Sequence, residues 1–127
     1  MPSKCSLSRI NLAKDLLTFA RTEAKEGYTT NNDIRIRDSA EKAYLAAVEA
    51  TDFLMECHGR SPGVGPEAHD VRHRFLQEIG RRDLEKDYSY YTDTLHGTCF
   101  YRGVCPTRDS METILQEIQQ YIDKVQA

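Results

Sequence analysis

Apolar residues recur at helical spacing along almost the whole chain. They fall three or four positions apart, which places their side chains on one face of an α-helix. No run of β-branched residues alternates for long enough to predict a strand. The pattern therefore predicts an all-α protein, an up-and-down bundle of four long helices and one short helix with antiparallel neighbours.

The first predicted helix runs from about Ser6 to Glu26 and is ended by Gly27. One face of it is apolar at Ile10, Ala13, Leu17, Ala20 and Ala24. A second apolar set lies on roughly the opposite side, at Leu12, Leu16 and Phe19. Because one packing partner cannot cover both sides, this helix is expected to be central or to lie at an oligomer interface.

The second predicted helix runs from about Ile36 to Cys57, after the loop "GYTTNND". Its alanines favour the helix and allow a neighbouring helix to approach closely. They stand at Ala40, Ala43, Ala46, Ala47 and Ala50. His58 is predicted to cap the helix C-terminus, where the helix dipole favours it. The stretch "HGRSPGVGP" that follows is a loop, too short to be a domain linker.

Apolar residues at helical spacing resume after Glu67 and are interrupted near Gly80. They return in the following segment, which has one apolar face. That face carries Leu84, Tyr88, Tyr91, Leu95, Thr98 and Cys99. The last helix, from about Ser110 to Val125, has the clearest apolar stripe and is entered through "CPTRDS". No internal repeat is present, so residues 1–127 are predicted to form a single helical-bundle domain.

Composition and charge narrow the class of protein. With 39% hydrophobic and 29% charged residues, the chain is typical of a globular domain. A net charge of −3 argues against a protein that coats duplex DNA through positive potential. No segment has signal-peptide character or approaches the roughly 20 apolar residues that span a bilayer. We therefore expect a cytoplasmic protein without membrane association.

The four cysteines, Cys5, Cys57, Cys99 and Cys105, form no Cys-x-x-Cys pair. A chain with a core of this size has no need of disulfides, so they are predicted to be free thiols. Zinc ligation by Cys57 with His58, or by Cys99 with Cys105, does not match the spacing of structural zinc sites. The sequence predicts no metal site and no cofactor.

Three segments, in order, carry a family resemblance: "IRIRDSAEKAYLAAVEATDFLM", "HDVRHRFLQEIG" and "LHGTCFYRG". The chain resembles small archaeal and bacterial helical proteins of the HEPN superfamily, in particular an uncharacterised branch with an Ala-rich helix and a Leu-His followed by a paired aromatic and a glycine. The resemblance spans most of residues 6–125 and rests mainly on hydrophobic pattern. It implies a homodimer that binds a nucleotide, RNA or a nucleotidyltransferase-like protein.

Active HEPN ribonucleases carry an Arg followed, after four to six residues, by a His, and two copies cleave RNA across a dimer without metal. Before His96 the corresponding positions hold Ser89, Tyr90 and Tyr91. Cleavage by a 2′-hydroxyl needs a proton acceptor, a proton donor and a cation, and a lone His supplies one of these. The resemblance therefore favours a non-catalytic binding module. The alternative is a divergent metal-independent ribonuclease or the HEPN component of a toxin–antitoxin pair.

The predicted ligand groove consists of His96, Phe100, Tyr91 and Arg102. Imidazole and aromatic faces stack on bases, and a nearby arginine holds a phosphate. If the protein is an enzyme, His96 is the candidate catalytic residue. The alternative for His96 is a half-buried imidazole that forms a hydrogen bond with a neighbouring helix.

The densest basic cluster comprises Arg72, Arg74, Arg81 and Arg82. These are candidates for phosphate contacts. We favour a surface of paired charges instead, because Glu78, Asp83 and Glu85 interleave with the arginines. His69 and His73 have the i, i+4 spacing of a metal site but no matched third ligand, which favours a solvated helix face.

Overall fold

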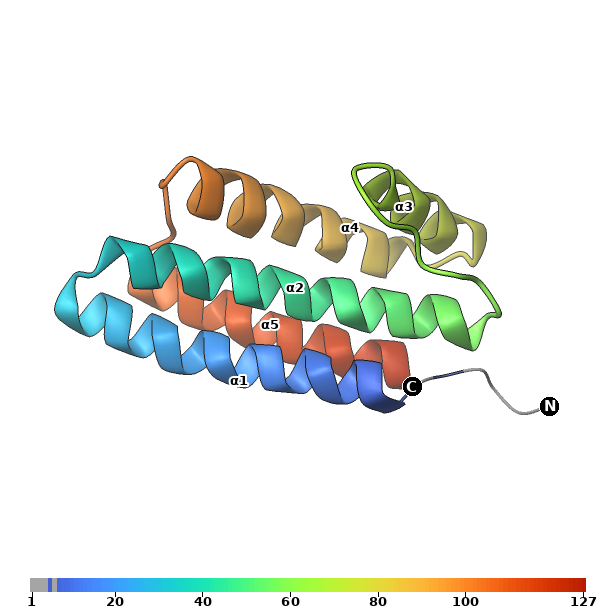
Figure 1. Cartoon of the computed structure of the whole chain (residues 1–127), viewed down its shortest axis with the longest axis horizontal. Coiled ribbons are helices and arrows are strands. Elements are labelled where there is room, and N and C mark those ends of the chain that lie inside the picture. The colour runs from blue at the N-terminus through green and yellow to red at the C-terminus, as the bar shows by residue number, and fades with distance from the viewer. Residues whose placement is uncertain (1–4, 6) are drawn as a thin grey trace.

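The computed structural model describes residue 5 and residues 7–127, and within these residues it contains helices and no strands (Figure 1). The prediction of an all-α protein is confirmed. Ser6, at which the sequence starts the first helix, lies outside the described residues. The elements are α1 (Leu7–Thr30), α2 (Asp33–Cys57), α3 (Ala68–Glu78), α4 (Arg82–Tyr91), the π-helix η1 (Thr92–Tyr101) and α5 (Arg108–Gln126).

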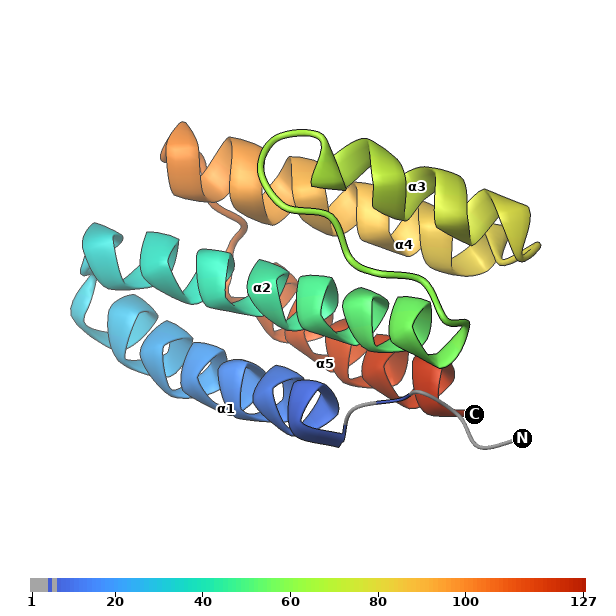
Figure 2. The ribbon, with the colours of Figure 1, turned by 45° about the vertical axis from the view of Figure 1, so that its right-hand side comes forward.

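The central helix is α2, which packs against every other element. It forms an antiparallel hairpin with α1, and α5 lies along both of them (Figures 1 and 2). On the other side of α2, α4 and η1 form one continuous helical rod, and α3 lies beside α4 (Figure 2). The alanines predicted to allow close approach line this central helix and are fully buried.

The turn between α1 and α2 differs from the prediction. Gly27 does not end α1, which continues to Thr30. Gly27 is buried where the two helices meet, and a Cβ there would lie 2.8 Å from Cγ1 of Ile36. The chain turns instead at Asn31, whose φ is 53°, and the Asn32 side chain caps α2. Glycine is therefore needed for close packing, not for chain reversal.

The core is built from the apolar faces that the helical spacing predicts. All five predicted residues of the α1 face are buried, and so is the whole α5 stripe. Three tyrosines are the largest fully buried side chains: Tyr88, Tyr91 and Tyr121. The hydroxyl of Tyr121 lies 2.6 Å from Thr51 Oγ1 of α2, which satisfies the one polar atom that this ring carries into the core.

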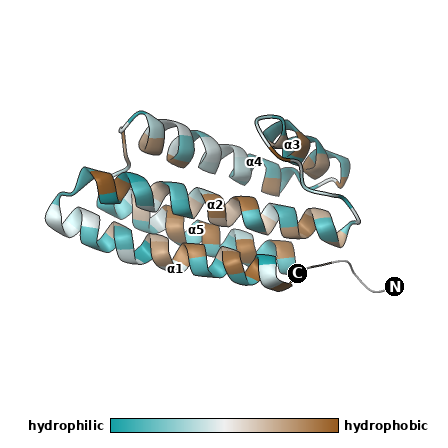
Figure 3. Ribbon diagram, viewed as in Figure 1, coloured by the Kyte–Doolittle hydropathy of each residue, from teal (hydrophilic) through white to brown (hydrophobic). Residues whose placement is uncertain are grey.

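Hydrophobic (brown) and hydrophilic (teal) residues alternate along the helices in Figure 3. Among the described residues, no helix combines the length and the apolar character needed to cross a membrane.

The prediction of free cysteines is wrong. Cys5 is bonded to Cys57 and Cys99 to Cys105, so the described part of the chain has no free thiol. The first bond joins the segment before α1 to the end of α2, across 52 positions of sequence. The second closes the turn between η1 and α5. Both pairings depend on how the helices pack, which cysteine spacing does not reveal.

Candidate functional site

Helix α4 changes its hydrogen-bonding pattern at Thr92 and continues as a π-helix to Tyr101. The periodicity predicts an α-helix here. π-Helical segments are rare and are found frequently at functional sites. Arg37 of α2 caps the far end, because its Nε and Nη2 donate to the Phe100 carbonyl at 2.9 and 2.6 Å and Nη2 donates to the Tyr101 carbonyl at 3.0 Å. The π-helix is thus fixed to the central helix.

Four rings gather where η1 meets α2, and we name Tyr44, His96, Phe100 and Tyr101 the aromatic cluster. The imidazole of His96 stacks on Tyr44 with centroids 4.7 Å apart, and Phe100 lies nearly parallel to it at 6.2 Å. Tyr101 meets the imidazole edge-on at 4.9 Å. Tyr44 is buried, whereas Tyr101 is 67% exposed. The cluster therefore opens to solvent at Tyr101.

His96 also forms a hydrogen bond with the central helix. Its Nδ1 lies 2.7 Å from Oε1 of Glu41, and both side chains are about three-quarters buried, with exposed fractions of 28% and 19%. Because a carboxylate accepts hydrogen bonds, Nδ1 is the donor to Glu41, and Nε2 is the ring nitrogen left for another partner. This confirms the expected half-buried imidazole bonded to a neighbouring helix, and it also creates an oriented proton acceptor.

A second set of polar groups lies between α2, α3 and α4, and we name it the polar chain. Arg72 donates to both carboxylate oxygens of Asp52, at 2.8 and 3.2 Å, and to the Tyr88 hydroxyl at 3.3 Å. The Tyr88 hydroxyl lies 3.2 Å from Nδ1 of His69, and the Tyr44 hydroxyl lies 3.2 Å from Nε2. Tyr44 therefore belongs to both the polar chain and the aromatic cluster.

The charges of the polar chain follow from burial. Burial lowers the pKa of His69, and the positive charge of Arg72 adds to this effect. Burial raises the pKa of Tyr44 and that of Tyr88. For Arg72 burial acts against the charge and is the largest single effect on its pKa, but the hydrogen bonds and electrostatic interactions with Asp52 and Tyr88 together outweigh it, so the pKa is raised. At neutral pH the polar chain therefore combines the Arg72–Asp52 ion pair with neutral donors and acceptors, and Nη1 of Arg9 lies 3.7 Å from Oδ2 of Asp52.

The structure brings together only part of the predicted ligand groove. His96 and Phe100 are neighbours in the aromatic cluster. Tyr91 does not join them, because it is buried in the core and packs edge-on against Tyr121 at 5.8 Å. Arg102 is exposed at the end of η1 and makes no side-chain ion pair with a described residue. Glu41 and Tyr44 of α2 are absent from the predicted groove, since no local signal shows which helix faces lie opposite one another. Tyr101 is also absent from it, although a local signal exists, because Tyr101 is the second residue of the aromatic pair after His96.

The four arginines of the basic cluster do not form one patch. Arg72 is buried and held by Asp52, so it is not a surface phosphate contact. Arg81 pairs with Asp83 at 3.0 Å, as expected for a surface of paired charges. Arg74 and Arg82 are exposed, and neither pairs with an acidic residue in the described part of the chain.

His69 and His73 do share one helix face, with ring centroids 6.2 Å apart. Around them lie the Tyr88 hydroxyl, the Ser89 hydroxyl and the Glu85 carboxylate, which is 3.7 Å from Nδ1 of His73. Within residue 5 and residues 7–127, no group of three or more His, Cys, Asp or Glu side chains is placed to hold a metal ion.

The aromatic cluster combines the exposed ring of Tyr101, the buried ring of Tyr44 and an imidazole, His96, that is oriented by Glu41.

Comparison of the chain with profiles of known protein families, with characterised proteins and with solved structures finds no match. The resemblance to HEPN proteins therefore rests on the three quoted segments.

Proposed function

We propose that this chain is a HEPN-like binding module that holds a base of single-stranded RNA on the aromatic cluster. The observation that carries the proposal is Tyr101, a ring that is 67% exposed yet set edge-on against His96. Aromatic side chains bind bases of any sequence by stacking on their faces. Arg102 follows directly and supplies a free cation for the phosphate of the same nucleotide.

A binding role without chemistry is supported by the arginines near the cluster. Arg37 donates to the backbone carbonyls that end η1, and Arg72 is paired with Asp52. Neither guanidinium is free to stabilise the charge that develops on a phosphate during cleavage, so of Arg37, Arg72 and Arg102, Arg102 alone can contact a phosphate. His96 and Glu41 then serve to hold the stacking surface in place.

Tyr101→Ala is expected to weaken RNA binding about tenfold, because stacking on one ring contributes roughly 1–3 kcal/mol per base. The measurement is fluorescence anisotropy with a labelled single-stranded RNA of about ten nucleotides, at fixed salt. Tyr90→Ala is the matched control, since Tyr90 is a 48% exposed tyrosine of α4 that packs on Tyr91, outside the cluster.

Equal losses from Tyr101→Ala and Tyr90→Ala would remove the cluster as the RNA site. An absence of binding by the unchanged protein would overturn the proposal altogether. Competition by a free mononucleotide as effective as the RNA itself would assign the site to a nucleotide instead of a strand.

A second candidate function, a metal-independent ribonuclease, is favoured by one observation, the hydrogen bond between His96 and Glu41. Nε2 of His96 would take the proton of a ribose 2′-hydroxyl as the 2′-oxygen bonds to phosphorus. The bond from phosphorus to the 5′-oxygen then breaks, and the 5′-oxygen takes a proton from a second acid. In a toxin–antitoxin component acting as a dimer, His96 of the second copy would be that acid.

Under this second candidate, His96→Ala should lower the rate of RNA cleavage by roughly 10²–10⁴, the usual contribution of a positioned acid–base group. Cleavage is measured on denaturing gels with EDTA present. His58→Ala is the control, because His58 is the exposed cap of α2 and packs on Phe75, away from η1. Cleavage that survives His96→Ala excludes His96 as the catalyst, and intact RNA with the unchanged protein leaves binding as the function.

We also propose that the protein is a homodimer joined through the outer side of the α1–α2 hairpin. Two residues of the second apolar set of the first helix stay exposed, Leu12 at 46% and Phe19 at 61%, whereas Leu16 is half-buried and packs against the core. Leu45 of α2 adds a further exposed side chain. The charges beside this face are paired within the chain, Arg9 with Glu49 at 2.9 Å and Lys42 with Glu23 at 2.6 Å. A second copy would therefore meet no unpaired charge from these four residues.

Phe19→Asp is expected to convert the dimer to a monomer, because a carboxylate would be buried at the interface. Light scattering at about 10 µM protein measures the mass directly. Thr18→Asp places the same charge on a different side of α1 and should leave the dimer intact. A monomeric unchanged protein at this concentration would rule the interface out.

A further inference from the structure

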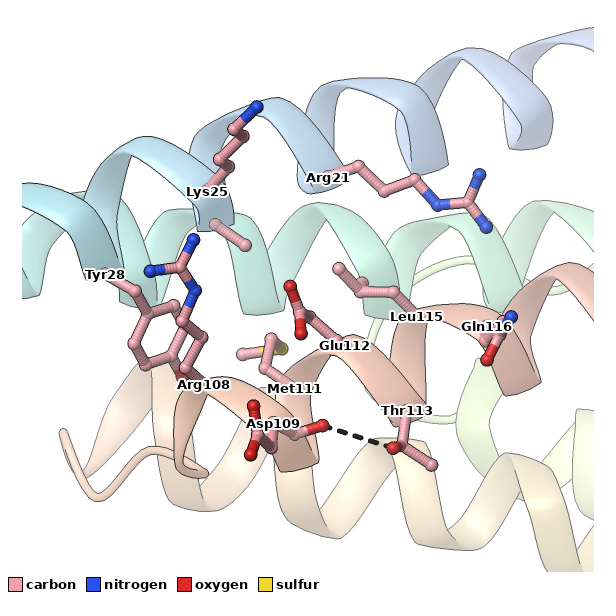
Figure 4. A pocket seen from close by; sticks show the side chains of 11 residues that line it. Arg21, Lys25, Tyr28, Arg108, Asp109, Met111, Glu112, Thr113, Leu115 and Gln116 are labelled. Atoms are coloured by element: carbon pink, nitrogen blue, oxygen red, sulfur yellow. Dashed lines mark hydrogen bonds between the residues drawn. The ribbon is translucent and has the colours of Figure 1, made fainter.

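A groove of about 820 Å³ lies between α1 and the first turns of α5 (Figure 4). It is separate from the aromatic cluster, which is formed by α2 and η1. Its size is in the range of sites for small molecules. The polar side chains that line it and carry the argument are Arg21, Lys25 and Tyr28 from α1 and Arg108, Asp109 and Glu112 from α5.

Three cations border this groove. Arg21 and Lys25 stand one turn apart on α1, and Arg108 approaches from α5. Figure 4 shows the guanidinium of Arg108 directed toward α1, between Tyr28 and Glu112. None of the three forms an ion pair with an acidic residue of the described chain, in contrast to Lys42 on the other side of the hairpin. The groove thus holds three cations that form no ion pair with a described residue, although Asp109 and Glu112 line it as well.

Tyr28 forms a fixed wall at one end. Its hydroxyl donates to the Pro106 carbonyl at 2.6 Å, which holds the segment before α5 against α1. Burial raises the pKa of Tyr28 to about 12, so the phenol stays neutral and adds no negative charge near Arg108. Arg108 is the first residue of α5, directly after the cap Thr107 and two residues after Pro106.

Two carboxylates line the same groove in different orientations. Asp109 points away from α1 in Figure 4, and its backbone carbonyl accepts from Thr113 Oγ1 at 3.1 Å. Glu112 points toward α1 and has no hydrogen-bond partner in the described structure. A free carboxylate beside free cations suits a ligand that carries both an anion and hydrogen-bond donors.

We propose that the groove binds a small phosphorylated molecule that bears hydroxyl groups, such as a sugar phosphate. The phosphate lies against the Arg108 guanidinium, where it forms charge-assisted hydrogen bonds, and Arg21 and Lys25, whose head groups are directed away from Arg108 in Figure 4, add longer-range attraction. A hydroxyl of the ligand donates to Glu112, which also keeps this carboxylate apart from the phosphate. This binding does not depend on the proposed RNA site.

The test is isothermal titration calorimetry with ribose 5-phosphate, which has no base and cannot stack on Tyr101. Arg108→Gln is expected to weaken binding about tenfold, the effect of losing one charge-assisted contact. Arg82→Gln, which removes an exposed unpaired arginine of α4 outside the groove, should change the affinity less than about twofold. Ribose without phosphate should bind at least about tenfold more weakly.

Undetectable binding of ribose 5-phosphate at about 10 mM would overturn the proposal, as would equal effects of Arg108→Gln and Arg82→Gln. Inorganic phosphate that binds as tightly as ribose 5-phosphate would show that Glu112 recognises no hydroxyl and reduce the site to a simple anion site, contrary to the proposal. Loss of RNA binding in Tyr101→Ala, with ribose 5-phosphate binding retained, would show that the two sites are independent.

Discussion

Replacing Asp52 by alanine is expected to lower the free energy of unfolding by about 3–5 kcal/mol, the usual cost of leaving one partner of a buried ion pair alone. Asp52 is 4% exposed and receives two hydrogen bonds from Arg72, which is itself buried. Without the Asp52 carboxylate, the Arg72 guanidinium remains in the interior, where the Tyr88 hydroxyl is its remaining hydrogen-bond partner. Urea unfolding followed by circular dichroism measures the change.

Two controls separate this effect from the loss of packing. Asp83→Ala removes an exposed ion pair to Arg81 and should cost less than about 1 kcal/mol. Asp52→Ala combined with Arg72→Met removes both charges, and most of the lost stability should return. If the double variant is as unstable as Asp52→Ala alone, the stability loss does not come from an uncompensated charge.

Cys57→Ser is expected to lower the free energy of unfolding by about 4 kcal/mol, because the Cys5–Cys57 bond closes a long loop in the unfolded chain. The corresponding Cys105→Ser variant opens a loop of only 6 positions and should lose about 2 kcal/mol by the same relation. Both are measured against the oxidised protein. With reductant present, the unchanged protein should lose the combined stability, and the serine variants should lose only that of their remaining bond.

Titration of thiols in the denatured, unreduced protein provides the direct check on these pairings. The structure leads us to expect no free thiol from the four cysteines. Four free thiols would instead agree with the expectation from sequence and contradict both bonds. Disulfides are typical of oxidising compartments and of intracellular proteins of hyperthermophiles. The cytoplasmic location therefore stays a prediction that depends on this measurement.

The aromatic cluster shows why the candidate site was only partly predictable. The segment "LHGTCFYRG" indicated His96 and Phe100 because an imidazole stood beside aromatic residues. The sequence also predicts Tyr91 in this groove, yet Tyr91 lies in the core against Tyr121. A helical wheel places residues on one face, but it does not say whether that face meets solvent or another helix.

The sequence by itself determined the properties of single helices. The apolar faces of α1 and α5, the buried alanines of α2 and the position of the His58 cap all follow from residues within a few positions of one another. Their physical cause is local, since helical periodicity and capping act over one or two turns.

Only the tertiary structure decided the features that join distant segments. These are the close approach at Gly27, the pairing of Cys5 with Cys57, the burial of Arg72 beside Asp52 and the bond from His96 to Glu41. Each depends on which helix faces lie opposite one another and on how the helices are shifted along their axes relative to one another. Side-chain packing across the whole bundle sets that register, and no short stretch of sequence contains it.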